Sequence, residues 1–313
     1  MTDDNSKQKS IQDQVGELKK AAEERAEQDL NAKMDSNEMQ KVIYPSDKIA
    51  FYSQGMIENK TIFLPNSSRQ TSFIISKDNE LQITIGKAGG HKDYGVLKTK
   101  HRDVMYAVLA IWASQNWPVW KNQDGVRLGV IKTSRYKILN LILQKNPGSD
   151  NYKSLMDTLY DLKVIPIEVE DINSEETKEV FSMFFGFDFE SEKGNDVITI
   201  YLNPYITRKY YEQKDLKLLF YNTYRNLSSD IAKTLYPIID RALGINNEYS
   251  KKVIDLCNEN GMTTYRYNAD YRTKWKKALI ELNKIELTNG KKIVAEFYEN
   301  SLKELIFIVK SAK

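Results

Sequence analysis

The 313-residue chain has one cysteine, two histidines and no long apolar run, and each shortage excludes a class of protein. The single thiol, Cys257, cannot form an internal disulfide, a cysteine-rich zinc site or an iron–sulfur cluster. It lies among apolar residues at helical spacing, so we expect a small buried side chain rather than a reactive thiol. The longest apolar run, residues 104–113, is far shorter than the ~20 residues that a membrane span needs.

The amino-terminal segment lacks large apolar side chains. Residues 1–40 hold ten acids and six bases; since the whole chain carries +3 and this segment −4, residues 41–313 carry +7. So polar a segment cannot offset its ordering entropy, and we expect a flexible acidic arm, either disordered or helical over residues 11–34. It contains no apolar signal segment, so we expect a cytoplasmic protein. The basic body suits a nucleic-acid binder.

Histidine is too scarce for the sites of common DNA-processing enzymes. His91 and His101 do not form the closely spaced metal-binding pair of a rolling-circle nickase, and no histidine follows His101, as a tyrosine recombinase would require. Paired acids at 168/170 and 188/190 alternate along strand-like stretches, where solvated acidic faces are far commoner than metal sites. The glycine-rich segment 86–91 lacks the ending of a phosphate loop and predicts a hairpin or loop. We therefore expect no enzyme, cofactor or bound metal.

What the chain does contain is a pattern that occurs twice. Two stretches with helical apolar spacing, residues 103–112 and 151–167, occur again at 229–239 and 271–287, at offsets of 127 and 120 positions. Ser228 or Ser229 would cap the first of the later helices. The second match aligns five apolar pairs and one acidic pair: Leu155/Trp275, Leu159/Leu279, Leu162/Leu282, Ile165/Ile285, Ile167/Leu287 and Asp161/Glu281.

Strand-like segments follow the helices in both halves. A shorter helix separates the matched helices, and three helices followed by a β-hairpin is the plan of a winged-helix domain. The β-branched segments are 164–169, 181–189 and 197–202 in the first half, and 285–287, 291–298 and 304–309 in the second, where Asn289-Gly290 marks a turn. We expect an α+β chain of two tandem winged-helix domains, with the arm at 1–40, an N-terminal domain with extra strands at 41–210 and a C-terminal domain at 211–313.

The later copy of the third helix carries the cations that contact with DNA needs. Residues 265–292 hold eight bases against three acids. The third helix of a winged helix lies in the major groove and the hairpin reaches the flanking backbone. The predicted DNA-binding set of the second domain is therefore Arg266, Asn268, Arg272, Lys274, Lys276, Lys277, Lys291 and Lys292, with the first three reading base edges. The alternative is an ordinary solvated lysine face on a surface helix.

The corresponding region of the first domain is less basic. Its predicted DNA-facing residues are Asn151, Lys153 and Ser154 on the matched helix and Arg135 and Lys137 on the preceding one. With fewer cations, this domain should bind DNA more weakly and with more polar contacts. A cluster of aromatic and basic residues at 205–211 suits either stacking on bases or packing between the two halves.

The run Leu227–Tyr236 and the cationic helix 272–282 resemble the C-terminal winged helix of plasmid replication initiators, particularly TrfA-like and related iteron-binding proteins. The stretch 94–99, which leads into the helix at Asp103, resembles the start of their N-terminal domain. The resemblance covers roughly residues 60–310, and it departs from the family in the low charge of the first recognition-type helix and in an acidic loop at 170–178.

That resemblance implies a non-enzymatic initiator of a plasmid, phage or mobile element. Such a protein binds direct repeats in double-stranded origin DNA, opens the adjacent duplex, recruits host replication proteins such as helicase, and forms homodimers through its N-terminal domain. Two other functions fit the same pattern. A winged-helix transcriptional regulator would bind a single operator, and a winged-helix scaffold would bind a protein and would not need the lysine face.

Overall fold

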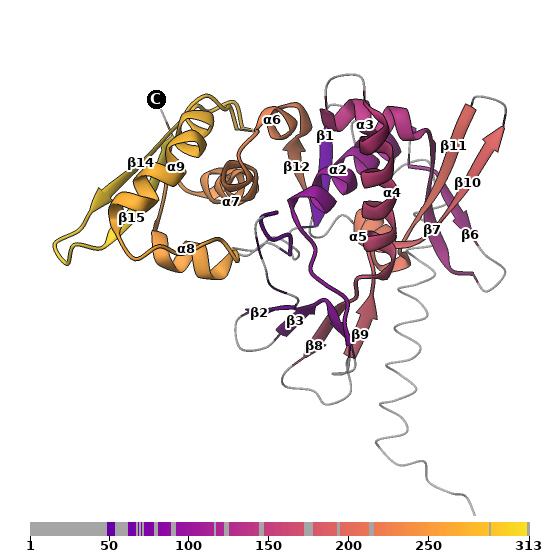
Figure 1. Cartoon of the computed structure of the whole chain (residues 1–313), viewed down its shortest axis with the longest axis horizontal. Helices are drawn as coiled ribbons and strands as arrows, with labels where there is room; N and C mark the ends of the chain where they lie inside the picture. Colours follow the sequence, from indigo (N-terminus) through magenta and orange to yellow (C-terminus); the bar gives the residue numbers. More distant parts are fainter. Residues whose placement is uncertain are drawn as a thin grey trace, which may run out of the picture. The chain divides into compact units, whose positions relative to one another are not determined.

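The computed structural model describes residues 49–53, 62–66, 68, 70, 72–77, 81–88, 92–115, 117–121, 125–143, 147–171, 178–192, 195–212, 216–287 and 289–311 (Figure 1). The predicted arm, residues 1–40, lies outside these ranges, as does most of the acidic loop at 170–178. No helix in the described ranges is both long and apolar enough to cross a membrane.

The first half forms a winged helix, as predicted. Its helices are α2 (Thr99–Ser114), α3 (Arg135–Leu143) and α4 (Ser149–Val164). Its antiparallel sheet has the order β10 (Phe184–Glu192), β11 (Asn195–Leu202), β7 (Arg127–Thr133) and β6 (Val119–Lys121). The hairpin β10–β11 is the wing, and β6 and β7 were not predicted.

Trp112 at the end of α2 is the centre of this domain's core. Its indole is fully buried, donates a hydrogen bond to the carbonyl of Pro118 (3.0 Å), and packs edge-on against Trp117 and Tyr210. Gly129 on β7 lies directly against it, because a Cβ at that position would come within 2.7 Å of the indole ring. The close approach of strand and helix therefore requires glycine here.

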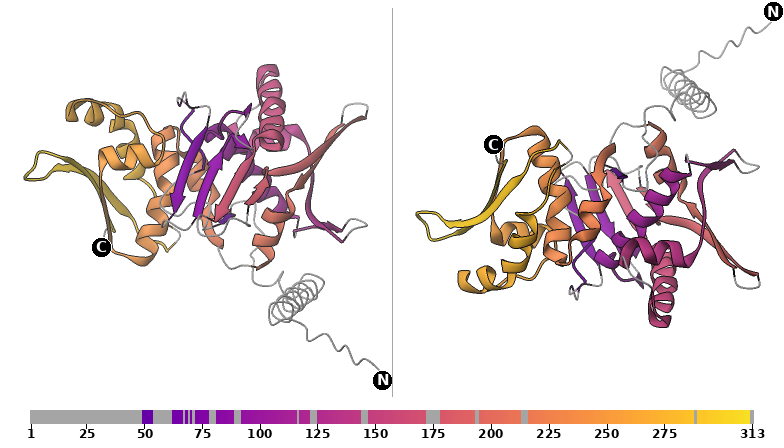
Figure 2. Two further views of the ribbon diagram at one scale, coloured as in Figure 1. Left: turned by 90° about the horizontal axis from the view of Figure 1, so that it is seen from below. Right: turned by 90° about the horizontal axis from the view of Figure 1, so that it is seen from above.

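The second half repeats the plan. Its helices are α7 (Asp230–Ile245), α8 (Val253–Glu259) and α9 (Asn268–Leu282), and its sheet has the order β13 (Glu248–Lys252), β15 (Leu305–Ser311), β14 (Ile293–Glu299). Trp275 of α9 is fully buried, with its ring centroid 5.5 Å from that of Phe297 and 5.8 Å from that of Phe307. In each half the hairpin projects as a twisted ribbon past the helices of its own domain (Figure 2).

The segment 164–169 does not belong to the wing, and this corrects the expected strand assignment. Pro166 cannot continue α4 because it has no backbone N–H, and its carbonyl accepts a hydrogen bond from the N–H of Gly86 (2.9 Å). The chain therefore turns toward a separate sheet with the order β2 (Phe73–Lys77), β3 (Leu81–Ile85), β8 (Ile167–Asp171), β9 (Lys178–Phe181). Residues 285–287 form only an isolated bridge, between Glu286 and Lys292.

Two short strand pairs complete the described sheets. Strands β4 (Lys87–Ala88) and β5 (Lys92–Asp93) form the hairpin predicted for the glycine-rich segment. Strand β1 (Ile49–Ser53) pairs with β12 (Leu216–Phe220), so segments that precede and follow the first winged helix in the chain meet. The division at residue 210 stays a prediction.

Polar contacts join α2 to the second half. Asp103 accepts hydrogen bonds from Nζ of Lys233 on α7 (2.8 Å) and from the hydroxyl of Tyr224 on α6 (Tyr221–Asn226; 2.6 Å). Arg102, fully buried, donates from Nε to the same hydroxyl (2.9 Å). The 205–211 cluster lies on α5 (Pro204–Glu212). There Tyr210 is 3% exposed and packs on Trp112 of α2 and on Trp117, which follows α2. This favours packing over base stacking for this residue.

Candidate nucleic-acid interface

The predicted recognition helix α9 divides cleanly into a buried and a cationic face. Tyr271, Trp275, Ala278 and Leu282 are buried at helical spacing. The side chains exposed on the other faces include those of Lys274, Lys276 and Lys277. A helix fixed through one stripe can present the rest of its surface to a groove without rearranging the core.

The three lysines form no ion pair with any residue that the structure describes, whereas several neighbouring charges are paired. Glu281, in the last turn of α9, does not offset them. It turns to α7 and accepts hydrogen bonds from the backbone N–H groups of Ser228 (3.1 Å) and Ser229 (3.0 Å) and from the Ser228 hydroxyl. The lysine ammonium groups can therefore exchange counterions for phosphates.

The wing of the second domain is fastened to α9 along its length. Asn283 at the end of α9 exchanges two hydrogen bonds with the backbone of Ala295 on β14, at 2.9 and 2.7 Å. In the middle, a guanidinium nitrogen of Arg272 lies 3.2 Å from the carboxylate of Glu299. Near the start, the amide of Asn268 donates to the carbonyl of Lys303 (3.1 Å). These contacts set the distance between helix and wing before any ligand binds.

The three residues predicted to read base edges differ in their contacts. Arg266 is exposed, and its guanidinium lies 5.3 Å from the ring centre of Tyr267, itself 59% exposed. Arg272 and Asn268 reach the wing instead, although Arg272 remains 44% exposed. At the start of the wing, Lys291 is exposed with its Nζ 3.3 Å from the amide oxygen of Asn247, and Lys292 is exposed beside it.

In the first domain, the structure brings fewer cations to the surface. Lys153 and Ser154 on α4 and Lys137 on α3 are exposed. Asn151 is half-buried, and its side-chain oxygen accepts the N–H of Gly148 (2.9 Å), which closes the first turn of α4. Its role in the described conformation is therefore that of a capping partner.

Arg135, the remaining predicted residue, is enclosed by protein groups. It forms an ion pair with Asp196 at the start of β11, and its guanidinium lies 4.6 Å from the ring centre of Phe189 and 5.3 Å from that of Tyr152. These partners come from the wing and from α4, so Arg135 joins α3, α4 and the wing. Its geometry is that of a positioning residue for the wing rather than of a side chain that projects toward DNA.

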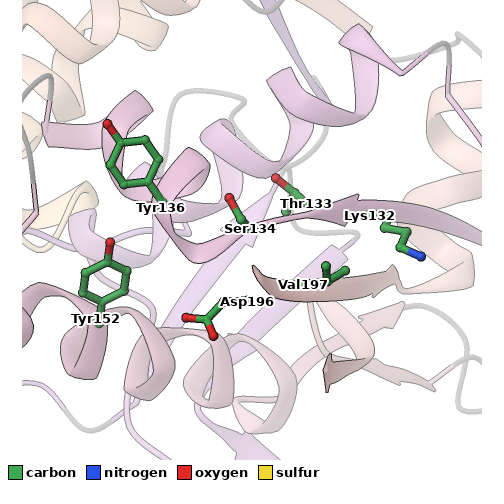
Figure 3. Close-up of a pocket in the computed structure, with 7 residues that line it drawn as sticks. All are labelled: Lys132, Thr133, Ser134, Tyr136, Tyr152, Asp196 and Val197. Atoms are coloured by element: carbon green, nitrogen blue, oxygen red, sulfur yellow. The ribbon is translucent and has the colours of Figure 1, made fainter. Parts of the chain in front are cut away.

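Beside Arg135 is a pocket that sequence reasoning did not anticipate (Figure 3). Its volume is about 510 Å³, and it is lined by Lys132, Thr133, Ser134, Tyr136, Tyr152, Asp196 and Val197. The pocket was missed because β7 was not predicted. The available signals were the β-branched residues Val130, Ile131 and Thr133, which favour a strand, and the Thr-Ser pair before a helical stretch, which is typical of a helix start.

Neither a metal-binding cluster nor an exposed thiol occurs in the part of the chain that the structure describes. No cluster of three or more His, Cys, Asp or Glu side chains there could hold a metal ion. Cys257 is fully buried, as predicted, and burial raises the pKa of its thiol to about 12. A thiol so protonated is a poor nucleophile and metal ligand.

The fold is shared with solved structures of RctB. Its domains 2 and 3 superpose with a TM-score of 0.55 at 10% identity, over 80% of this chain and 93% of that chain. A second structure of these domains gives 0.53 at 10% identity, over 83% and 97%. The Pi initiator protein, solved in complex with iteron DNA, matches at a TM-score of 0.46 and 16% identity, over 68% and 90%.

No protein-family model and no curated protein matches the sequence of this chain. The predicted tandem winged-helix fold is confirmed by the helices and sheets of both halves, and domains 2 and 3 of RctB share this fold.

Proposed function

We propose that the chain is a sequence-specific double-stranded-DNA-binding replication initiator of a plasmid, phage or mobile element. The observation that carries the proposal is the lysine face of α9, whose ammonium groups have no acidic partner among the described residues while the wing is fastened alongside. A rigid helix-and-wing unit with unpaired cations fits the major groove and the flanking phosphates. No cofactor is needed for this activity.

The proposed DNA contacts are of two kinds, contacts to phosphates and contacts to base edges. Lys274, Lys276 and Lys277 neutralise phosphates, a contribution that is independent of sequence and strongly dependent on salt. Arg266 and Arg272, at the start of α9, present planar guanidinium groups that suit bidentate contacts to guanine. The wing lysines, Lys291 and Lys292, add backbone contacts. The first domain contributes a second, weaker contact through Lys137, Lys153 and Ser154.

The initiator role rests on the sequence resemblance and on the duplication. A chain with two winged helices can contact two successive segments of one duplex, which suits an origin that contains direct repeats. Opening of the neighbouring A·T-rich duplex, recruitment of host proteins such as helicase and formation of homodimers belong to the same proposal.

The test is a footprint of the protein on the DNA that flanks its gene. An initiator protects several evenly spaced direct repeats beside an A·T-rich tract, and permanganate reactivity of thymines in that tract rises when the protein binds. A plasmid that carries this region should replicate only when the protein is supplied. Protection of one operator at a promoter, with no effect on replication, would instead assign the chain to the transcriptional regulators. Absence of specific protection anywhere in the flanking DNA would contradict both.

A further inference from the structure

We propose that the pocket between α3, α4 and the first wing is a phosphate-binding site. In the DNA complex its ligand is a phosphate of the duplex backbone, and this identification of the source rests on the proposed function. The site itself is argued from an unpartnered buried hydroxyl, a helix N-terminus, a set of hydroxyl donors and local charge.

The pocket is lined mainly by hydrogen-bond donors. Ser134, Tyr136 and Tyr152 turn their hydroxyl groups in the same direction, above Asp196 in the view of Figure 3. They come from three places in the chain: the residue before α3, the first turn of α3, and the first turn of α4. Hydroxyl groups gathered from separate elements suit a ligand with several acceptor oxygens, as a phosphate has.

Thr133 provides an observation independent of the helix N-terminus. Its side chain lines the pocket and is only 9% exposed, and its hydroxyl oxygen has no hydrogen-bond partner among the described residues. A buried hydroxyl without a partner is unfavourable and uncommon in folded proteins. A phosphate oxygen in the pocket would accept its proton and remove that cost.

The N-terminus of α3 adds a positive potential. The helix has nine residues and begins at Arg135, directly after Ser134, whose hydroxyl oxygen accepts the N–H of Lys137 (3.2 Å). The first N–H groups of a helix have no partner within the helix, and the helix dipole places partial positive charge at this end. A helix start with a hydroxyl-lined pocket beside it is a common way to bind phosphate.

The formal charges nearby permit an anion to bind. Asp196 is the one acid among the described residues that line the pocket, and the ion pair with Arg135 neutralises it. Lys132 lines the pocket and is exposed, and Lys137 is exposed one turn into α3. Counting Arg135 and Lys137 beside the pocket, three bases stand against this one acid, so the local formal charge is positive even though α4 carries few bases.

This site gives the first domain a different part in the complex from that of α9. It holds the backbone at one fixed point through hydroxyls and a helix dipole, and it does not depend on a lysine-rich helix. That division accounts for the low charge of α4, because a backbone contact made through hydroxyls and a helix dipole needs few lysines.

The experiment compares Thr133→Val, which removes the hydroxyl and keeps the shape, with Thr234→Val. Thr234 is fully buried and its hydroxyl also lacks a partner among the described residues, but it lies on α7, away from the pocket. Affinity for the repeat duplex is measured with each phosphate replaced in turn by a neutral methylphosphonate. We expect Thr133→Val to bind about fivefold more weakly and Thr234→Val to bind like wild type. At one phosphate, the methylphosphonate should weaken wild type more than it weakens Thr133→Val.

A second arm titrates inorganic phosphate into the DNA-free protein and follows the backbone amide resonances of residues 132–137. If a methylphosphonate at one position weakens wild type more than Thr133→Val, the bound phosphate belongs to the DNA backbone. Saturable shifts in wild type that vanish in Thr133→Val, without coupling to DNA, identify a free phosphate-bearing ligand. If neither response occurs, the phosphate site is wrong. If wild type does not bind duplex at all, the proposed function fails, and the amide titration still decides on the pocket.

Discussion

The carboxylate of Asp161 on α4 lies 2.9 Å from Nε2 of His101 on α2. Nδ1 of the same ring accepts the backbone N–H of Lys98 (2.6 Å), so Nε2 carries the proton and donates to Asp161. In the second half, Glu281, 120 positions after Asp161, bonds to Ser228, 127 positions after His101. The duplication therefore includes the polar contact that fastens the third helix of each domain to its first.

The buried His101 should make stability depend on pH. Burial lowers the pKa of His101 below its usual 6.5, and the bond to Asp161 opposes this only in part. The unfolded chain therefore takes up a proton at a higher pH than the folded one, so the free energy of unfolding falls as pH drops through about 6.5. Urea unfolding at pH 7.5, 6.5 and 5.5 should show this fall in wild type and in His91→Asn, but not in His101→Asn. An unchanged pH dependence in His101→Asn would refute it.

Glu281→Gln should destabilise the fold. One amide oxygen cannot accept all three bonds that the carboxylate receives from Ser228 and Ser229. Because the site is partly solvated, we expect a loss of about 1 kcal/mol in the free energy of unfolding. Glu296→Gln, on the exposed face of β14, is the matched control and should lie within about 0.5 kcal/mol of wild type. Equal effects of the two substitutions would argue against the contact.

The aspartates at matched positions of α2 and α7 should differ in importance. Asp103 is 15% exposed and holds Lys233, which is 13% exposed. Its counterpart Asp230 accepts solvent-exposed bonds from the backbone and side chain of Asn66 (3.2 and 3.1 Å). Asp103→Ala leaves a buried cation unpaired and should cost about 3 kcal/mol, whereas Asp230→Ala should cost about 1 kcal/mol. Chemical denaturation measures both, and the reverse order would contradict the assignment.

The lysine face of α9 should control the salt dependence of DNA binding. Replacing Lys276 and Lys277 together by alanine should weaken binding to all duplex sequences. If each lysine neutralises one phosphate, the slope of log affinity against log salt should become shallower by about 2. The variant with arginine at both positions keeps the charge and should retain the slope. An unchanged affinity at two salt concentrations would remove α9 from the interface.

Arg272→Ala should reduce discrimination among DNA sites more than it reduces binding to random duplex, because base contacts carry the sequence information. The ion pair with Glu299 offers a control for an indirect effect through the wing. Glu299→Gln breaks the pair and keeps the guanidinium, so it should preserve discrimination. If Glu299→Gln lost as much specificity as Arg272→Ala, Arg272 would act by positioning the wing.

The sequence by itself determined the matched helices, their duplication and the cationic face of α9. Helical periodicity is a local property, so the spacing that predicted burial at Leu155 and Trp275 was correct at both sites, where exposure is 2% and 0%. The wing hairpins were predictable for the same reason, since each strand pairs with its neighbour in sequence.

Only the tertiary structure decided which distant strands pair and where charged side chains find partners. Thr133 meets Ile198 across β7 and β11, and the strand at 167–171 joins β3 instead of the wing. Arg135 was predicted to face DNA, but Asp196 and two aromatic rings surround it. Such partners lie about sixty residues apart in the chain, and their meeting depends on how complete elements pack, which no local pattern encodes.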